Sequence, residues 1–146
     1  MTAVPHIAAL VSGGVDSSTA LTLLARQFPG QIKAFYIKIW LEDDLSFLGD
    51  CPWKEDLNYV QEVCKQLQIP LEVVSLQQDY YERIVSYTLE ELKAGRTPSP
   101  DVLCNQRIKF GVFYDRIGSS FEKIATGHYA QTKIISGKTH LVRSPD

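Results

Sequence analysis

The stretch that decides the fold is Ser12-Gly13-Gly14-Val15-Asp16-Ser17-Ser18, which directly follows the short apolar run at residues 6–11. Two adjacent glycines allow positive φ and a close approach of the backbone to a ligand. The apolar spacing of residues 17–28 predicts a helix after the turn, so unpaired amide groups and the positive end of the helix dipole face outward. The sequence therefore predicts an anion-binding strand-to-helix turn, which is neither GxxxxGK[ST] nor GxGxxG.

Oxygen-bearing side chains add to this turn. The hydroxyl groups of Ser12, Ser17 and Ser18 can donate to phosphate oxygens, whereas phosphate repels the carboxylate of Asp16 unless a cation lies between them. Mg²⁺ is the natural cation, because proteins hold it through one or two carboxylates together with substrate phosphates. The alternative is a plain capping turn in which Ser or Asp caps the helix.

Outside this turn, strand-like and helix-like segments alternate along the chain. Strands are predicted at residues 6–11, 32–40, 71–76 and 123–126, helices at residues 17–28, 53–67, 80–93 and 106–117, and a hairpin around Gly137. Residues 95–105 are interpreted as a loop with several prolines. Such alternation predicts an α/β fold with a doubly wound parallel sheet, in which ligands bind beyond the carboxyl ends of the strands.

Composition excludes several classes of protein. A chain of 146 residues with 45% hydrophobic residues forms about one domain with a core of its own. Its three cysteines, Cys51, Cys64 and Cys104, form no CxxC pair, which argues against zinc and favours a reducing compartment, the cytoplasm or an organelle matrix. No apolar stretch suits a membrane span or an export signal. Residues 123–143 contain four bases and no acid, which is compatible with a polyanionic partner.

Three further motifs carry a resemblance to a known family. SGGVDSS looks like the pyrophosphate loop of ATP pyrophosphatases. The block GRTPSPDVLCN at residues 95–105 with IKF at 108–110, the block ATGHYA at 125–130, and Lys38 with Trp40 are similar to motifs of tRNA-specific 2-thiouridylases. The resemblance covers the whole chain, and it implies the adenine-nucleotide α-hydrolase-like (Rossmann-like) version of the doubly wound sheet.

The resemblance also implies an activity. The family performs ATP-dependent 2-thiolation of the wobble uridine of tRNA through an adenylated base and a cysteine-borne persulfide sulfur. Its members use ATP, Mg²⁺ and persulfide sulfur from sulfur-carrier or cysteine desulfurase relay proteins, and the partner is tRNA, with no membrane. By this resemblance the chain is a tRNA-modifying sulfurtransferase with nucleotide-binding and RNA-binding functions.

Site residues follow from the resemblance position by position. It implies that the ATP phosphates contact Leu10, Val11, Ser12, Gly13, Gly14, Val15, Asp16 and Ser17, and that the nucleoside end contacts Ile37 and Gly127. Ser99, Pro100 and Asp101 correspond to contacts with the target base, Cys104 to the first catalytic cysteine, and Asp16 to a contact with Mg²⁺. The chain departs from the family at Ile37, where methionine is common, and at Ser99, where asparagine is usual. The second change removes or alters an amide hydrogen bond to the base.

The chemistry of Cys104 can also be argued from the residues. A thiolate is a strong nucleophile, and its pKa is expected to be lowered because Cys104 begins a predicted helix near Arg107 and Lys109. Asp101 could accept a proton or hold the loop. The alternative role for Cys104 is that of a small buried apolar residue, which is the role predicted for Cys64 on its apolar stripe. His128 is expected either to contact ATP or the activated base, or to be structural.

Family members are much longer and carry a second catalytic cysteine. Residues 1–146 are therefore expected to form an ATP-binding pyrophosphate-loop domain that stops before the remaining catalytic segment and tRNA-binding domains, and that does not complete turnover alone. Two other functions stay open from sequence. One is a different pyrophosphate-loop adenylating ligase or amidotransferase, which leaves the Cys104 loop unexplained; the other is a noncatalytic nucleotide-binding module.

Overall fold

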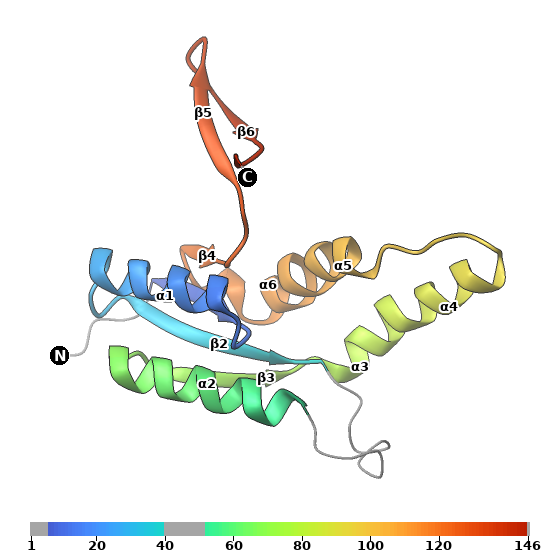
Figure 1. The fold of residues 1–146 in the computed structure, drawn as a ribbon, viewed down its shortest axis with the longest axis horizontal. Helices are drawn as coiled ribbons and strands as arrows, with labels where there is room; N and C mark the ends of the chain where they lie inside the picture. Colours follow the sequence, from blue (N-terminus) through green and yellow to red (C-terminus); the bar gives the residue numbers. More distant parts are fainter. Residues whose placement is uncertain (1–5, 40–51, 146) are drawn as a thin grey trace.

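The computed structural model describes residues 6–39 and 52–145. Its main sheet has four parallel strands: β1 (Ile7–Val11), β2 (Ile32–Lys38), β3 (Leu71–Ser75) and β4 (Lys123–Ala125). The spatial order is β3-β2-β1-β4 (Figure 1). The chain adds β2 and β3 on one side of β1 and returns to add β4 on the other. This confirms the predicted α/β class and parallel sheet, with Trp40 and Cys51 outside the described residues.

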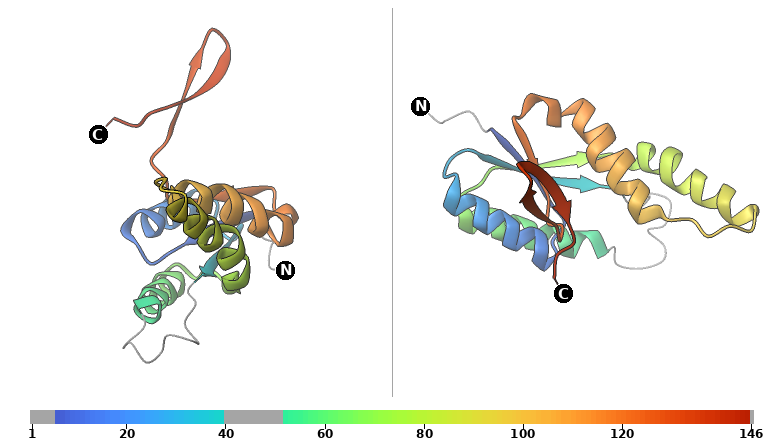
Figure 2. Two further views of the ribbon diagram at one scale, coloured as in Figure 1. Left: turned by 90° about the vertical axis from the view of Figure 1, so that its right-hand side faces the viewer. Right: turned by 90° about the horizontal axis from the view of Figure 1, so that it is seen from above.

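Helices cover both faces of this sheet (Figure 2, right). Helices α1 (Val15–Gln27) and α2 (Pro52–Leu67) pack on one face. Side chains alternate along a strand, so Ile7, Ala9 and Val11 of β1 face these two helices, while Ala8 and Leu10 face the other layer. All five residues of β1 are buried, which explains its uninterrupted apolar sequence.

The apolar stripe predicted for the second helix is confirmed. Val60 and Cys64 are 2% and 3% exposed and lie in the core between α2 and the sheet, with Leu57 and Leu67 packed beside them. Burial raises the pKa of the Cys64 thiol. Cys64 therefore has the core role expected of it.

Two long helices cover the opposite face. The first comprises α3 (Gln77–Tyr80), η3 (Tyr81–Val85) and α4 (Ser86–Lys93). The second comprises α5 (Pro100–Leu103), η4 (Cys104–Val112) and α6 (Phe113–Arg116), followed by the short η5 (Gly118–Ser120). The segments η3 and η4 are π-helical, and helical dihedral angles at each junction make both helices continuous. Phe35 of β2 packs against this layer, with its ring 5.2 Å from that of Phe113.

Two sequence-based expectations about these helices are wrong. The helical spacing of residues 80–93 predicts that Leu89 and Leu92 face inward, but they are 46% and 57% exposed, because α4 runs beyond the ends of the strands (Figure 1). The helix predicted to begin near residue 106 begins at Pro100. Proline is favoured in the first turn of a helix, since its missing N–H has no intrahelical partner there.

The chain after β4 forms the predicted hairpin, β5 (Gln131–Ile135) and β6 (Lys138–Val142). Its two turn residues, Ser136 and Gly137, have φ of 50° and 75°, which is the type I′ geometry that matches strand twist. The hairpin projects away from the main sheet (Figures 1 and 2). None of the helices in the described part of the chain has the length and apolar character needed to cross a membrane.

Candidate functional site

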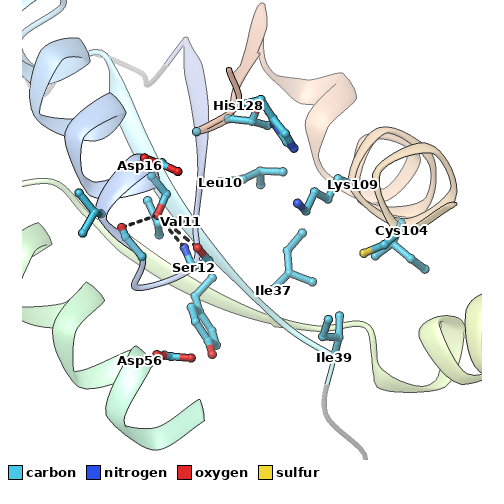
Figure 3. A pocket seen from close by; sticks show the side chains of 17 residues that line it. Leu10, Val11, Ser12, Asp16, Ile37, Ile39, Asp56, Cys104, Lys109 and His128 are labelled. Carbon is cyan, nitrogen blue, oxygen red and sulfur yellow. Dashed lines mark hydrogen bonds between the residues drawn. The ribbon is translucent and has the colours of Figure 1, made fainter. Parts of the chain in front are cut away.

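A cavity of about 380 Å³ lies where the strand order reverses, between the ends of β1 and β4 (Figure 3). This is the position at which open α/β sheets bind ligands. The residues that line the cavity come from five parts of the chain: Leu10, Val11, Ser12, Gly14, Val15, Asp16 and Ser17; Tyr36, Ile37 and Ile39; Asp56 of α2; Cys104, Ile108 and Lys109; and Thr126, Gly127 and His128.

The turn after β1 has the backbone conformation that its glycines predict. Gly13 adopts φ of +87°, and a Cβ atom there would lie 2.8 Å from the carbonyl oxygen of Asp56 in α2. Only glycine meets both conditions, because other residues rarely adopt this φ and the contact is with backbone. Gly13 does not itself line the cavity; it allows the turn to pack closely on α2, while Asp56 reaches the cavity wall.

The hydroxyl group of Ser17 organises this turn from the inside. Ser17 is 7% exposed; its Oγ accepts a hydrogen bond from the backbone N–H of Ser12 at 3.2 Å and donates one to the carbonyl of Gly14 at 3.1 Å. The hydroxyl of Ser18 also donates to Gly14, at 2.9 Å. Both serine hydroxyls therefore donate to the backbone of their own turn in this structure, and their donation to phosphate stays a prediction. The Ser12 hydroxyl lies 3.3 Å from Ser17 Oγ and donates to it, since the Ser17 proton goes to Gly14. Backbone amides at the start of α1 are therefore the donors left on this wall.

Gly127 brings the chain after β4 against the start of α1. A Cβ atom at this position would lie 2.6 Å from the amide nitrogen of Ser17 and 2.8 Å from the carbonyl carbon of Asp16. Both contacts involve backbone atoms, which cannot move aside as a flexible side chain can. Glycine at residue 127 therefore fixes the width of the cavity between β1 and β4.

Asp16 is the residue expected to hold Mg²⁺. Its carboxylate accepts a hydrogen bond from the Tyr129 hydroxyl at 3.3 Å and faces the cavity. No three His, Cys, Asp or Glu side chains gather into a metal-binding group within residues 6–39 and 52–145. One carboxylate beside an anion-binding turn still suits Mg²⁺, which takes most of its other ligands from phosphate and water.

Cys104 reaches the cavity from the opposite side, on η4 (Figure 3). Burial raises the pKa of its thiol, Lys109 opposes this rise, and Asp101 adds to it. The expected lowering of the pKa is wrong, chiefly because burial outweighs the effect of Lys109, and two features of the expected environment are also missing. Cys104 lies one turn inside the helix that starts at Pro100, and Arg107 points elsewhere, with its guanidinium donating to the carbonyl of Arg83 at 3.1 Å.

His128 is held by two hydrogen bonds. Its Nδ1 lies 2.7 Å from Thr126 Oγ1 and its Nε2 lies 3.3 Å from Asn105 Oδ1. An amide oxygen only accepts, so Nε2 carries the proton and the Thr126 hydroxyl donates to Nδ1. Burial, and next the charge of Lys109, lower the pKa of His128, which favours the neutral ring. Both nitrogens are thus engaged, and the ring offers no positive charge to a phosphate.

The structure brings together most, but not all, of the predicted site residues. The ATP-contact residues other than Gly13, together with Cys104, line one cavity. Ser99, Pro100 and Asp101 do not line it; they form the first turn of the helix that carries Cys104. Lys38 does not line it either, and its Nζ lies 4.4 Å from the centre of the Trp53 ring.

Sequence reasoning gave no site role to Asp56 and Ile39, which also line the cavity. Asp56 is recognisable only through its packing on Gly13, a contact between distant segments. Ile39 could have been predicted from sequence. It lies two residues after Ile37, and in an extended segment side chains two residues apart lie on the same face.

Comparison with a solved structure supports the fold. The chain aligns with an ammonia-dependent NAD synthetase from Campylobacter jejuni with a TM-score of 0.52 and 17% sequence identity, covering 81% of this chain and 44% of that chain. At this identity the likeness concerns the fold alone. It agrees with the parallel α/β sheet described above.

Comparison of sequences gives closer relatives. The chain is 47% identical over 141 residues to a tRNA-specific 2-thiouridylase MnmA of Porphyromonas gingivalis, covering 96% of this chain and 38% of the relative. It is 46% identical over 141 residues to that of Parabacteroides distasonis, covering 97% and 39%. The chain thus spans less than half the length of these relatives. Residues 5–146 match the family described as the tRNA methyl transferase HUP domain, and the chain belongs to that family.

Proposed function

We propose that residues 1–146 form the ATP-binding pyrophosphate-loop domain of a tRNA 2-thiouridylase, an enzyme that replaces the 2-oxygen of the wobble uridine with sulfur. The observation that carries the proposal is the shared cavity. The turn after β1, which has the properties of an anion site, and the thiol of Cys104 line opposite sides of one cavity although they are far apart in sequence. An adenylating ligase that uses no thiol would not need a cysteine in the cavity that holds the anion-binding turn.

ATP is proposed to bind with its phosphates on the turn after β1. The amides of Val15, Asp16 and Ser17 begin α1 and have no intrahelical carbonyl to bond with, so they can donate to phosphate oxygens. Ile37 provides an apolar contact for the nucleoside, and Gly127 lets the chain after β4 come close to it. Asp16 would hold Mg²⁺, whose charge would offset the repulsion between its carboxylate and the phosphates.

The thiolation chemistry explains why ATP and a thiol are needed together. A uracil carbonyl is a poor electrophile, and its oxygen leaves badly. Transfer of AMP to that oxygen, with release of pyrophosphate, makes it a good leaving group, and sulfur then displaces AMP. We propose that the outer sulfur of a persulfide, supplied by a donor protein, bonds to the activated carbon as AMP leaves. The Cys104 thiol then cleaves the remaining S–S bond, so that one sulfur stays on the base and Cys104 ends in a disulfide with the inner sulfur; Lys109 stabilises the Cys104 thiolate.

The base is proposed to enter over the first turn of α5. Ser99, Pro100 and Asp101 lie there, one turn before Cys104, and the charge of Asp101 acts on the Cys104 thiol. Reaction through free thiols favours a reducing compartment, either the cytoplasm or an organelle matrix.

The proposal is tested by following AMP and pyrophosphate release from labelled ATP with and without tRNA. We expect ATP binding to depend on Mg²⁺. We expect pyrophosphate release to occur only in the presence of tRNA. AMP formation without tRNA would favour a different adenylating ligase, and absence of ATP binding would overturn the proposal. In a chain with the full length of the relatives, Cys104→Ser should keep pyrophosphate release and lose 2-thiouridine; unchanged thiolation would remove Cys104 from the mechanism.

A further inference from the structure

We propose that the β5–β6 hairpin is an RNA-binding arm: a basic surface that holds the phosphate backbone of tRNA beside the cavity. We call the surface formed by Tyr129, Lys133, Lys138, His140 and Arg143 the basic surface of the hairpin. This inference rests on the proposed function, because tRNA is the RNA that would reach it.

The hairpin presents two chemically different faces. Residues directly opposite each other share a face, and the cross-strand pairs Lys133 with His140 and Ile135 with Lys138 fall on one side. The other side carries Ile134 and Leu141, each opposite a threonine and each 79% exposed. The strand register therefore gathers Lys133, Lys138 and His140 on one side of the arm, and Arg143 lies one residue beyond β6, beside Tyr129 at the base of the hairpin.

Charge complementarity identifies the partner of the basic face. Residues 123–143 carry four Lys or Arg side chains and no acid, although the whole chain has a net charge of −2. Both strands of the hairpin are exposed throughout, except for the half-buried Val142. No salt bridge within the described residues involves Lys133, Lys138 or Arg143. Exposed cations without acidic partners are the groups that neutralise RNA phosphates.

The base of the hairpin adds a contact that suits a nucleotide. Tyr129 and Arg143 line a groove of about 500 Å³ together with Ser144 and Pro145. Tyr129 is 79% exposed, so its ring is available for stacking. Single-stranded RNA is commonly bound by bases stacked on aromatic rings or guanidinium groups, next to cations that follow the backbone.

The segment that leads into the hairpin also lines the cavity. Thr126, Gly127 and His128 line the cavity, and the next residue, Tyr129, donates its hydroxyl to Asp16. RNA lying along the hairpin would therefore have an unpaired nucleotide next to the opening of the cavity. The basic surface would add affinity for any RNA sequence, because phosphate contacts carry no base information.

The test uses the 146-residue chain and a fluorescein-labelled tRNA anticodon stem-loop, with binding followed by anisotropy between about 50 and 200 mM salt. The variant Lys133→Gln/Lys138→Gln should weaken binding at least about fivefold at the lower salt and reduce the salt slope by about 2. The control, Lys65→Gln/Lys93→Gln, removes the same charge from two exposed lysines on α2 and α4. It should bind within about twofold of the unsubstituted chain.

A second pair of variants separates the ring of Tyr129 from its hydroxyl. Tyr129→Phe should keep RNA affinity, and Tyr129→Leu should lose about fivefold or more, since stacking is worth about 1–3 kcal/mol per base. Equal loss in the hairpin variant and the lysine control, or no RNA binding by the unsubstituted chain, would overturn the inference. ATP binding is measured in parallel and is expected to be unchanged in the lysine variants. If RNA binding fails while ATP binding is retained, only this inference fails; if ATP binding is absent, the proposed function fails.

Discussion

The substitution Gly127→Ala tests whether close packing of two backbones sets the geometry of the site. The added Cβ would lie 2.6 Å from the amide nitrogen of Ser17, which is about 0.8 Å short of ordinary contact. Because the obstructing atoms are backbone, the start of α1 must move by about this distance. Overpacking of this kind costs about 1–3 kcal/mol of stability. A misplacement of about 1 Å can cost on the order of 10²-fold in rate.

We therefore expect Gly127→Ala to lower ATP affinity by about tenfold or more, and tRNA-dependent pyrophosphate release further. Calorimetric titration with Mg²⁺ and ATP measures the affinity, and urea denaturation measures stability. Gly30→Ala is the matched control. Gly30 has φ of +74° and open space around it, so alanine there costs about 1–2 kcal/mol of strain far from the site. Gly127→Ala with unchanged ATP affinity, or Gly30→Ala with an equal loss, would refute the reasoning.

Three other substitutions have defined outcomes. Ser17→Ala removes a buried hydroxyl with two backbone partners, so the free energy of unfolding should fall by about 1–3 kcal/mol in urea denaturation, against less than about 0.5 kcal/mol for Ser18→Ala. Lys109→Gln removes the charge that lowers the pKa of Cys104, so alkylation of Cys104 near about pH 8, followed by peptide mass spectrometry, should slow several-fold; an unchanged rate would contradict the role of Lys109. The fold lowers the pKa of His128 below its ordinary 6.5, so the unfolded chain binds more protons and stability falls as the pH drops through about 6.5. His128→Gln should therefore flatten the dependence of the thermal-denaturation midpoint on pH in this range. An unchanged dependence would contradict this reasoning.

The sheet and its anion-binding turn could be predicted from sequence because local signals agree there. An apolar run, two glycines and an amphipathic segment follow one another at residues 6–28, and each signal alone points to strand, turn and helix. The fully buried β1 and the apolar stripe of α2 were readable for the same reason. Gly137 marked the hairpin turn, since type I′ geometry requires positive φ.

The remaining features depend on contacts between distant segments. Proline-rich residues 95–105 resemble a loop, yet Pro100 begins a helix and places Cys104 inside it, where burial raises the pKa of the thiol. The inward face of residues 80–93 was overestimated, because sequence periodicity does not show where the sheet ends. The hydroxyl partners of Ser17 were also hidden, since a serine in a turn can bond to a ligand or to its own backbone.

The charges around the cavity suggest an order for the two chemical steps. Burial and Asp101 keep Cys104 in its neutral thiol form, and Lys109 is the cation that opposes them. ATP bound as proposed would add negative charge to a cavity whose walls already carry Asp16 and Asp56, and would disfavour the thiolate further. Release of pyrophosphate removes that charge while the activated base remains. In the proposed mechanism the thiolate would thus be easiest to form after adenylation, which would protect Cys104 from reacting before its substrate is ready.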